Sequence, residues 1–145
     1  MEIKTRDFGI IEINQDEIIN FPAGIPGFVD YREYVFLPFD EDSPFVIMQS
    51  IEESELAFIL IAPWEIVSDY EFEIGEKIEE ALKVESEKDL LVFVTVSIHQ
   101  DINDMTVNLA APLLINNREK IGRQLILDGY PVRQPIFTDK EQVVK

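Results

Sequence analysis

The chain contains no cysteine and only one histidine, His99. Without cysteine there are no disulfides, no thiolate nucleophiles and no cysteine-based metal sites. A single histidine also excludes a two-histidine metal site or a histidine-paired relay within one copy of the chain. His99 follows an apolar run and precedes polar residues, so we interpret it as a surface or strand-end residue rather than a catalytic one.

The common motifs for phosphate binding and nucleophilic catalysis are missing as well. The sequence has no G-x-x-x-x-G-K-[ST], no G-x-G-x-x-G and no G-x-S-x-G. The segment from Asp101 to Asp104 fails as the start of a calcium loop, because Thr106 stands where glycine is needed and Pro112 where glutamate is needed. We therefore expect no enzyme, no metal and no cofactor.

A glycosidase-like pair of carboxylates is the enzymatic alternative. With 29 acidic side chains, close carboxylate pairs arise by chance and carry little information. Two buried acids with raised pKa values in a cleft would support this alternative.

Long apolar runs are also absent, since none approaches the ~20 residues of a membrane-spanning helix. The first seven residues are charged and lack the apolar stretch of a signal peptide. We therefore expect a cytoplasmic protein with no membrane partner. The 145 residues, 46% of them hydrophobic, suffice for one domain with its own core. We expect that domain at residues 1–137, a frayed charged tail at 138–145, and a monomer.

Basic side chains are scarce: 12 against 29 acidic ones, for a net charge of −17. Such a chain repels phosphates, so we expect no direct nucleic acid binding. A basic protein is the natural partner; the alternative is that acidity only maintains solubility. The negative charge is concentrated between Glu65 and Asp89. The acidic residues there are Glu65, Asp69, Glu71, Glu73, Glu76, Glu79, Glu80, Glu85, Glu87 and Asp89.

Short β-prone runs separated by turn residues dominate the pattern. They span residues 3–13 (a hairpin), 17–21, 34–39, 45–51, 56–62, 70–74, 90–98, 105–109, 113–116 and 124–128. Ile74, Ile78, Ala81 and Leu82 follow the spacing of one short amphipathic helix. Since parallel α/β folds need repeated crossover helices, the sequence predicts a mainly β, antiparallel β-barrel-like single domain with about one short helix.

Residues 21–28, Phe-Pro-Ala-Gly-Ile-Pro-Gly-Phe, interrupt this pattern. Prolines fix φ and glycines permit φ > 0, so the segment should be a stiff, shaped connection. Ile25 and Phe28 either form an exposed apolar anchor or pack the loop onto the core, which is our interpretation.

Several polar or aromatic residues stand among the apolar strands. Asn108 and Gln124 should point outward, where their amides either bind a partner or satisfy local backbone groups. For Asn116 and Asn117 we favour the local role, which asparagine often takes in turns. Trp64 is either an interface residue or a plug at the barrel end.

Three segments in order resemble the flagellar assembly factor FliW family. The first is Phe21-x-x-Gly-Ile-Pro-Gly-Phe28, and the second is Phe45-x-x-Met-Gln-Ser50 with Phe58 and Pro63. The third and most specific runs from Thr106-Val-Asn-Leu-Ala-Ala-Pro112 through Leu114-Ile-Asn116 to Gly122-Arg-Gln-Leu-Ile-Leu127 and Tyr130. The resemblance covers residues 3–137.

The resemblance implies a non-enzymatic regulator with a compact β-barrel-like fold. Proteins of this family bind the basic-surfaced translational repressor CsrA and, alternatively, newly made flagellin. Free flagellin occupies the factor and leaves CsrA able to block flagellin mRNA; export of flagellin releases the factor, which then captures CsrA. A narrower alternative is a flagellin chaperone without a translational role.

The charge gives this function a physical basis. A domain of charge −17 attached to CsrA would oppose the RNA backbone. Because the Debye length is about 8 Å at physiological salt, the acidic region must lie near the RNA groove to act. We therefore place the partner-binding candidates at Glu71, Glu73, Glu76 and Glu80, with Asn108 and Gln124 as further candidates. The alternative is a solvated acidic face with no partner role.

Overall fold

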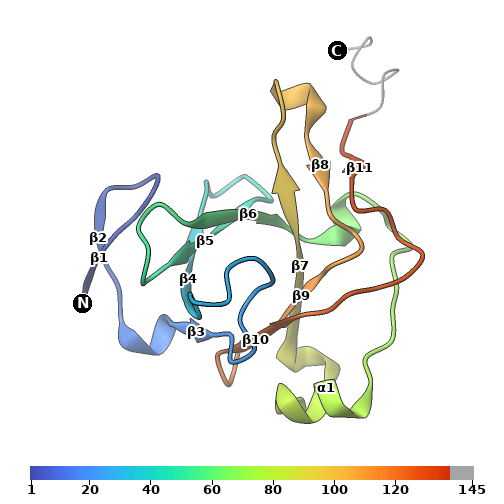
Figure 1. The fold of residues 1–145 in the computed structure, drawn as a ribbon, viewed down its shortest axis with the longest axis horizontal. Coiled ribbons are helices and arrows are strands. Elements are labelled where there is room, and N and C mark those ends of the chain that lie inside the picture. Colours follow the sequence, from blue (N-terminus) through green and yellow to red (C-terminus); the bar gives the residue numbers. More distant parts are fainter. Residues whose placement is uncertain (138–145) are drawn as a thin grey trace.

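The described part of the chain, residues 1–137 of a computed structural model, contains eleven short strands, one α-helix and four 3₁₀ helices (Figure 1). The strands are β1 (Glu2–Lys4), β2 (Ile10–Glu12), β3 (Ile19–Asn20), β4 (Glu33–Pro38), β5 (Val46–Ser50), β6 (Ala57–Ile61), β7 (Leu90–Ser97), β8 (Thr106–Val107), β9 (Leu113–Asn116), β10 (Ile121–Gln124) and β11 (Gln134–Pro135), and the helix is α1 (Glu76–Ala81). The tail predicted at 138–145 lies outside the described residues.

Seven strands close into a barrel in the order β7-β6-β5-β4-β3-β10-β9, with β9 pairing back onto β7. The long strand β7 is central, as its sequence predicts: its first half pairs with β9 and its second half with β6 and β8. The predicted mainly β, barrel-like fold with one short helix is confirmed. The single parallel contact in the ring is the bridge between Ile121 of β10 and Asn20 of β3.

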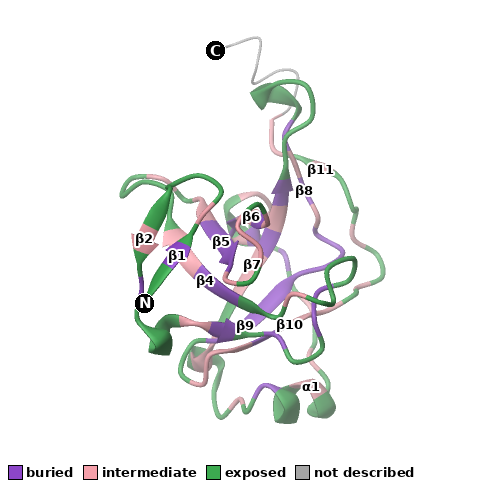
Figure 2. Ribbon diagram, turned by 60° about the vertical axis from the view of Figure 1, so that its left-hand side comes forward, coloured by how far each residue is buried: buried purple, intermediate pink, exposed green. Residues whose placement is uncertain are grey.

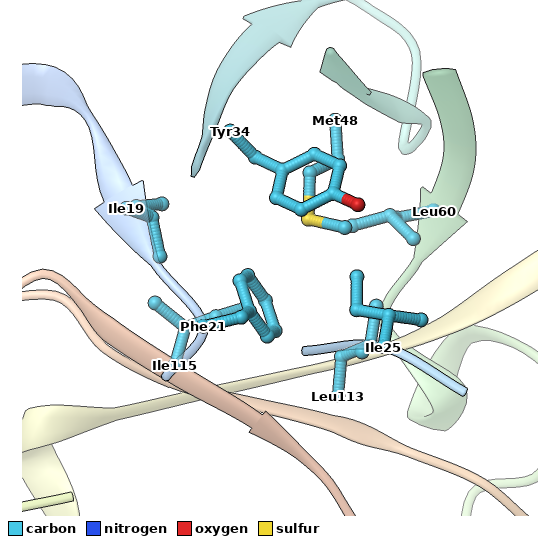
Figure 3. Close-up of a cluster of buried hydrophobic side chains, with 8 residues drawn as sticks. All are labelled: Ile19, Phe21, Ile25, Tyr34, Met48, Leu60, Leu113 and Ile115. Atoms are coloured by element: carbon cyan, nitrogen blue, oxygen red, sulfur yellow. The ribbon is translucent and has the colours of Figure 1, made fainter. Parts of the chain in front are cut away.

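The loop of residues 21–28, here called the plug loop, fills the inside of this ring (Figures 1 and 3). Phe21 and Ile25 are buried in a cluster with residues of five barrel strands: Ile19, Tyr34, Met48, Leu60, Leu113 and Ile115. Ile25 is therefore a core residue, as interpreted. Phe28 is 39% exposed but packs edge-on against Phe58, with ring centroids 5.3 Å apart.

Two glycines allow the plug loop to fit. Gly24 has a φ of +72°, and a Cβ there would lie 2.9 Å from the Cα of Val29. On the facing strand β10, a Cβ at Gly122 would lie 2.5 to 2.8 Å from three ring atoms of Phe21. The Phe21 ring thus needs a bare backbone opposite it, which explains why a strand position carries glycine.

A second apolar cluster lies around β7 and β8 and includes Tyr70, Val94, Val107 and Leu109. The predicted strand at residues 70–74 is wrong, because this segment joins no sheet. Its facing is nevertheless as predicted: Tyr70, Phe72 and Ile74 are more buried than Glu71 and Glu73. Alternating apolar residues indicate that one face of a segment is buried, whereas a β-strand also requires a neighbouring backbone with which to pair.

The predicted strand at 124–128 is shifted, since β10 ends at Gln124. The amides of Leu125 and Leu127 still donate to the carbonyls of Pro112 and Ala110, so this chain keeps following its neighbour. Strand β11 was not predicted. The predicted helix is confirmed as α1, with Leu82 buried after its end.

The hairpin β1–β2 is confirmed and packs through Ile3 and Ile13 onto Val35 of β4. Buried residues gather along the barrel strands, while α1 lies exposed beside them (Figure 2). No helix within residues 1–137 is long and apolar enough to cross a membrane.

Candidate functional site

The first candidate surface, here called the acidic face, comprises the ten carboxylates between Glu65 and Asp89. All except Asp89 are exposed, including the predicted Glu71, Glu73, Glu76 and Glu80. Glu76 and Glu80 lie on α1 and border a shallow hollow of about 380 Å³ with Lys83 and Glu85. Glu71 and Glu73 precede the helix on the extended segment. The structure therefore presents the predicted residues to solvent; their role in binding stays a prediction.

Asn116 of β9 fastens the C-terminal end of α1 to the barrel. Its fully buried amide nitrogen donates to the carbonyls of Leu82 (2.7 Å) and Lys83 (3.1 Å). Its oxygen accepts from the backbone amides of Arg118 and Glu119. The predicted local role is confirmed for Asn116 and extends to a partner more than 30 positions away.

Arg118 adds an ionic attachment beside it. Its guanidinium lies 3.1 Å from Asp89, 3.3 Å from Glu85 and 2.6 Å from Glu119. The hydrogen bond from Arg118 lowers the pKa of Asp89 to about 2, because it favours the ionised carboxylate. Asp89 thus stays charged throughout the physiological pH range.

Aromatic side chains hold the segment before α1. The Tyr70 hydroxyl donates to the carbonyl of Leu109 (2.7 Å), and the Trp64 indole donates to the carbonyl of Tyr70 (2.8 Å). The Tyr130 hydroxyl both donates to the carbonyl of Glu71 and accepts from its amide. Burial raises the pKa of Tyr70 to about 12. Trp64 is 45% exposed, so it lies on the surface rather than plugging the barrel end.

The second candidate surface, here called the barrel mouth, is a cavity of about 540 Å³ between the plug loop, strands β5 to β7 and the end of β10. Its lining is mainly apolar and includes Ile25, Phe28 and Phe58. Ile98 and Ile126 also belong to the lining and are 53% and 73% exposed. A concave apolar surface with a few polar groups is the usual form of a binding site.

Asn108 and Gln124 both line the barrel mouth, although they are 16 positions apart in sequence. Neither points fully outward, as both are half-buried. The Asn108 oxygen accepts from the amide of Ala110 (3.0 Å), and the Gln124 amide donates to the carbonyl of Ala111 (2.9 Å). The local role left open by the sequence is therefore present; a role in partner binding stays a prediction.

Sequence reasoning missed Gln49 and Arg6, which lock the β1–β2 hairpin to the barrel. Gln49 is fully buried; its oxygen accepts from the amide of Arg6, and its nitrogen donates to the carbonyls of Ser50, Ser54 and Leu56. The Arg6 guanidinium donates to the carbonyl of Ala57. The sequence feature that could have pointed to Gln49 is the polar Gln-Ser pair inside the otherwise apolar run 45–51.

His99 is exposed and contacts the Thr106 hydroxyl at 3.1 Å, as expected for a strand-end residue. Within residues 1–137, no three acidic or histidine side chains are grouped so that they could hold a metal ion. No acidic side chain in that range is buried either, so the pair that the glycosidase alternative requires is absent there.

Comparison with known proteins identifies the family. The model of the family described as FliW protein matches residues 2–136. A flagellar assembly factor FliW of Desulfitobacterium hafniense is 41% identical over 143 residues, covering 97% of this chain and 94% of the relative. Another of Alkaliphilus metalliredigens is 46% identical over 130 residues, covering 89% and 80%. A crystal structure of the flagellar assembly factor FliW matches with a TM-score of 0.89 at 34% identity, over 97% of this chain and 99% of the other. The chain therefore belongs to the FliW family of flagellar assembly factors.

Proposed function

We propose that this protein is a non-enzymatic partner switch that couples flagellin synthesis to flagellin export in the cytoplasm. It binds the repressor CsrA and antagonises its binding to flagellin mRNA, and it binds flagellin as the alternative partner. The observation that carries the proposal is the acidic face, in which nine of the ten carboxylates within one stretch, residues 65–89, are exposed.

Charge complementarity supports the CsrA half. A protein that binds RNA presents basic groups, and the acidic face is suited to attract them. Once bound, the same carboxylates raise the cost of bringing RNA phosphates within a Debye length of about 8 Å. The acidic face thus provides both recognition and repulsion without any reacting group.

The barrel mouth supports the flagellin half. Its apolar lining and the exposed Ile98 and Ile126 suit an apolar segment of a partner rather than a basic surface. Asn108 and Gln124 lie in that lining and could orient the backbone of such a segment. Two partners would then have two chemically different surfaces on one small domain.

The test is a titration of the purified protein into CsrA bound to labelled flagellin-leader RNA, repeated with excess flagellin. We expect the protein to release the RNA and flagellin to reverse the release. RNA that stays bound while flagellin still binds the protein would leave only the chaperone function. Binding to neither partner would contradict the whole proposal.

A further inference from the structure

Strand β7 has an unpaired edge next to the acidic face. Its register with β6 pairs Val94 with Ile61, so the residues opposite Val92 and Leu90 would be Pro63 and Glu65. Those residues form a 3₁₀ helix and leave the sheet. Pro63 has no N–H, and its carbonyl accepts from the amides of Ile66 and Val67. Within residues 1–137, the first half of β7 thus has a partner, β9, on one side only.

The hydrogen-bond pattern identifies the free backbone groups. The amide of Asn117 donates to the carbonyl of Asp89, which makes residues 89, 91 and 93 the ones that bond toward β9. The even-numbered residues therefore point to the other side, as Val94 does when it pairs with β6. The amide of Leu90 closes a 3₁₀ turn onto Glu87. The carbonyl of Leu90 and both backbone groups of Val92 face the open edge.

A cavity of about 480 Å³ lies along this edge, lined by Ala62, Trp64, Glu87 and residues 90–93. Leu91 and Trp64 are 37% and 45% exposed there. The Trp64 indole is held by its hydrogen bond to Tyr70 and by edge-on packing on the Tyr70 ring at 6.0 Å. A large aromatic side chain is therefore exposed but already ordered, which lowers the entropic cost of using it in an interface.

Two other open positions on the barrel strands are covered by side chains. Arg6 donates to the carbonyl of Ala57 at the start of β6, and Glu52 accepts from the amides of Arg32 and Glu33 at the start of β4. The edge at Val92 has only Glu87 of the acidic face in its cavity lining. A carboxylate accepts hydrogen bonds and cannot donate to a carbonyl.

We propose that this edge is the docking site for an extended, basic segment of CsrA, which adds to β7 as a short strand. The proposal rests on the proposed function and specifies where on this chain CsrA makes its contact. The backbone of the segment pairs with Val92 and the carbonyl of Leu90. A Lys or Arg side chain lies over the exposed Trp64 ring and near Glu87, where cation–π attraction and charge complementarity both favour it.

The test is amide hydrogen exchange of the full chain by NMR, free and with unlabelled CsrA. Free, the Val92 amide should exchange like a loop amide, while those of Leu91 and Phe93, bonded to β9, are slow. With saturating CsrA, Val92 exchange should slow at least tenfold. Trp64, the only tryptophan of this chain, should shift its side-chain indole resonance at the same time.

Variants separate docking from folding. Trp64→Ala should weaken CsrA binding at least tenfold, whereas Ile102→Ala, at an apolar residue that is 64% exposed and lines neither this cavity nor the barrel mouth, is the matched control and should change it less than twofold. CsrA that binds without slowing Val92 exchange would overturn the edge site and leave the proposed function standing. Failure of CsrA to bind overturns both. Slowing by flagellin instead of CsrA would overturn the assignment to a basic occupant.

Discussion

The acidic face and the barrel mouth differ in how they are tied to the core. The acidic face is fastened to the barrel by a few polar side chains, mainly Asn116, Arg118 and Tyr70. The barrel mouth is continuous with the core, because Ile25 and Phe58 contribute to both. Substitutions on the acidic face can therefore change binding without much effect on folding, whereas substitutions at the barrel mouth change both.

The largest loss of stability is expected where strand β10 faces the plug loop. Gly122→Ala places a Cβ within 2.5 to 2.8 Å of the buried Phe21 ring, which has no room to retreat. Overpacking of this kind should lower the free energy of unfolding by about 3 kcal/mol. The measurement is urea denaturation.

The matched control is Gly75→Ala, at the start of α1 on the acidic face. A Cβ there has no neighbour within 4 Å and the glycine has no positive φ; because Gly75 is the N-cap of α1, where alanine is less favourable, we expect a loss of at most about 1 kcal/mol. Equal losses in the two variants would contradict the difference between the barrel core, with which the barrel mouth is continuous, and the acidic face.

The next largest effect is expected where the acidic face is fastened. Asn116→Ala leaves the carbonyl of Leu82 and the amide of Arg118 without their buried partner. We expect a loss of about 2 kcal/mol, because an unsatisfied buried polar group is costly. The same denaturation experiment measures it.

Asn117→Ala is its neighbouring control. Asn117 accepts from the ammonium group of Lys120 at an exposed site, where such contacts contribute little. A loss as large as that of Asn116→Ala would show that the turn, and not the buried amide, fastens the helix.

Alkaline pH should weaken the attachment of the acidic face to the barrel at Tyr70. Its pKa is about 12 in the folded protein against the ordinary tyrosine value of 10, so its contribution is complete below pH 10 and is lost as pH rises toward 12. The Tyr70→Phe variant has no hydroxyl to ionise at this position, so it does not undergo this pH-dependent loss of stability. The stability advantage of the unmodified protein over the variant should therefore shrink between about pH 10 and 12, measured by denaturation at each pH. An advantage that is constant with pH would contradict the shifted pKa.

The smallest effect on stability is expected on the acidic face itself. The fourfold variant with Gln at Glu71, Glu73, Glu76 and Glu80 removes four exposed charges and should change the free energy of unfolding by less than about 1 kcal/mol. It should nevertheless weaken the antagonism of RNA binding by CsrA, and most clearly at low salt. Antagonism that is unchanged at every salt concentration would mean that the charge only maintains solubility.

The sequence by itself determined the class of the fold and most of its strands. Periodicity placed the hairpin β1–β2 and strands β4 to β7 and β9, because their apolar patterns are long or bounded by clear turns. It also identified the exposed carboxylates, since a dense run of charge has to remain in solvent.

Only the tertiary structure decided which strands pair and what closes the barrel. Residues 70–74 alternate like a strand yet pair with no strand within residues 1–137, and Gly122 looks like a weak strand residue until the Phe21 ring is placed against it. The unpaired edge of β7 depends on β6 ending at Pro63 and on the register between the two strands. Strand pairing joins segments that are distant in sequence. A local pattern therefore predicts which face of a segment is buried, but not which strand lies beside it.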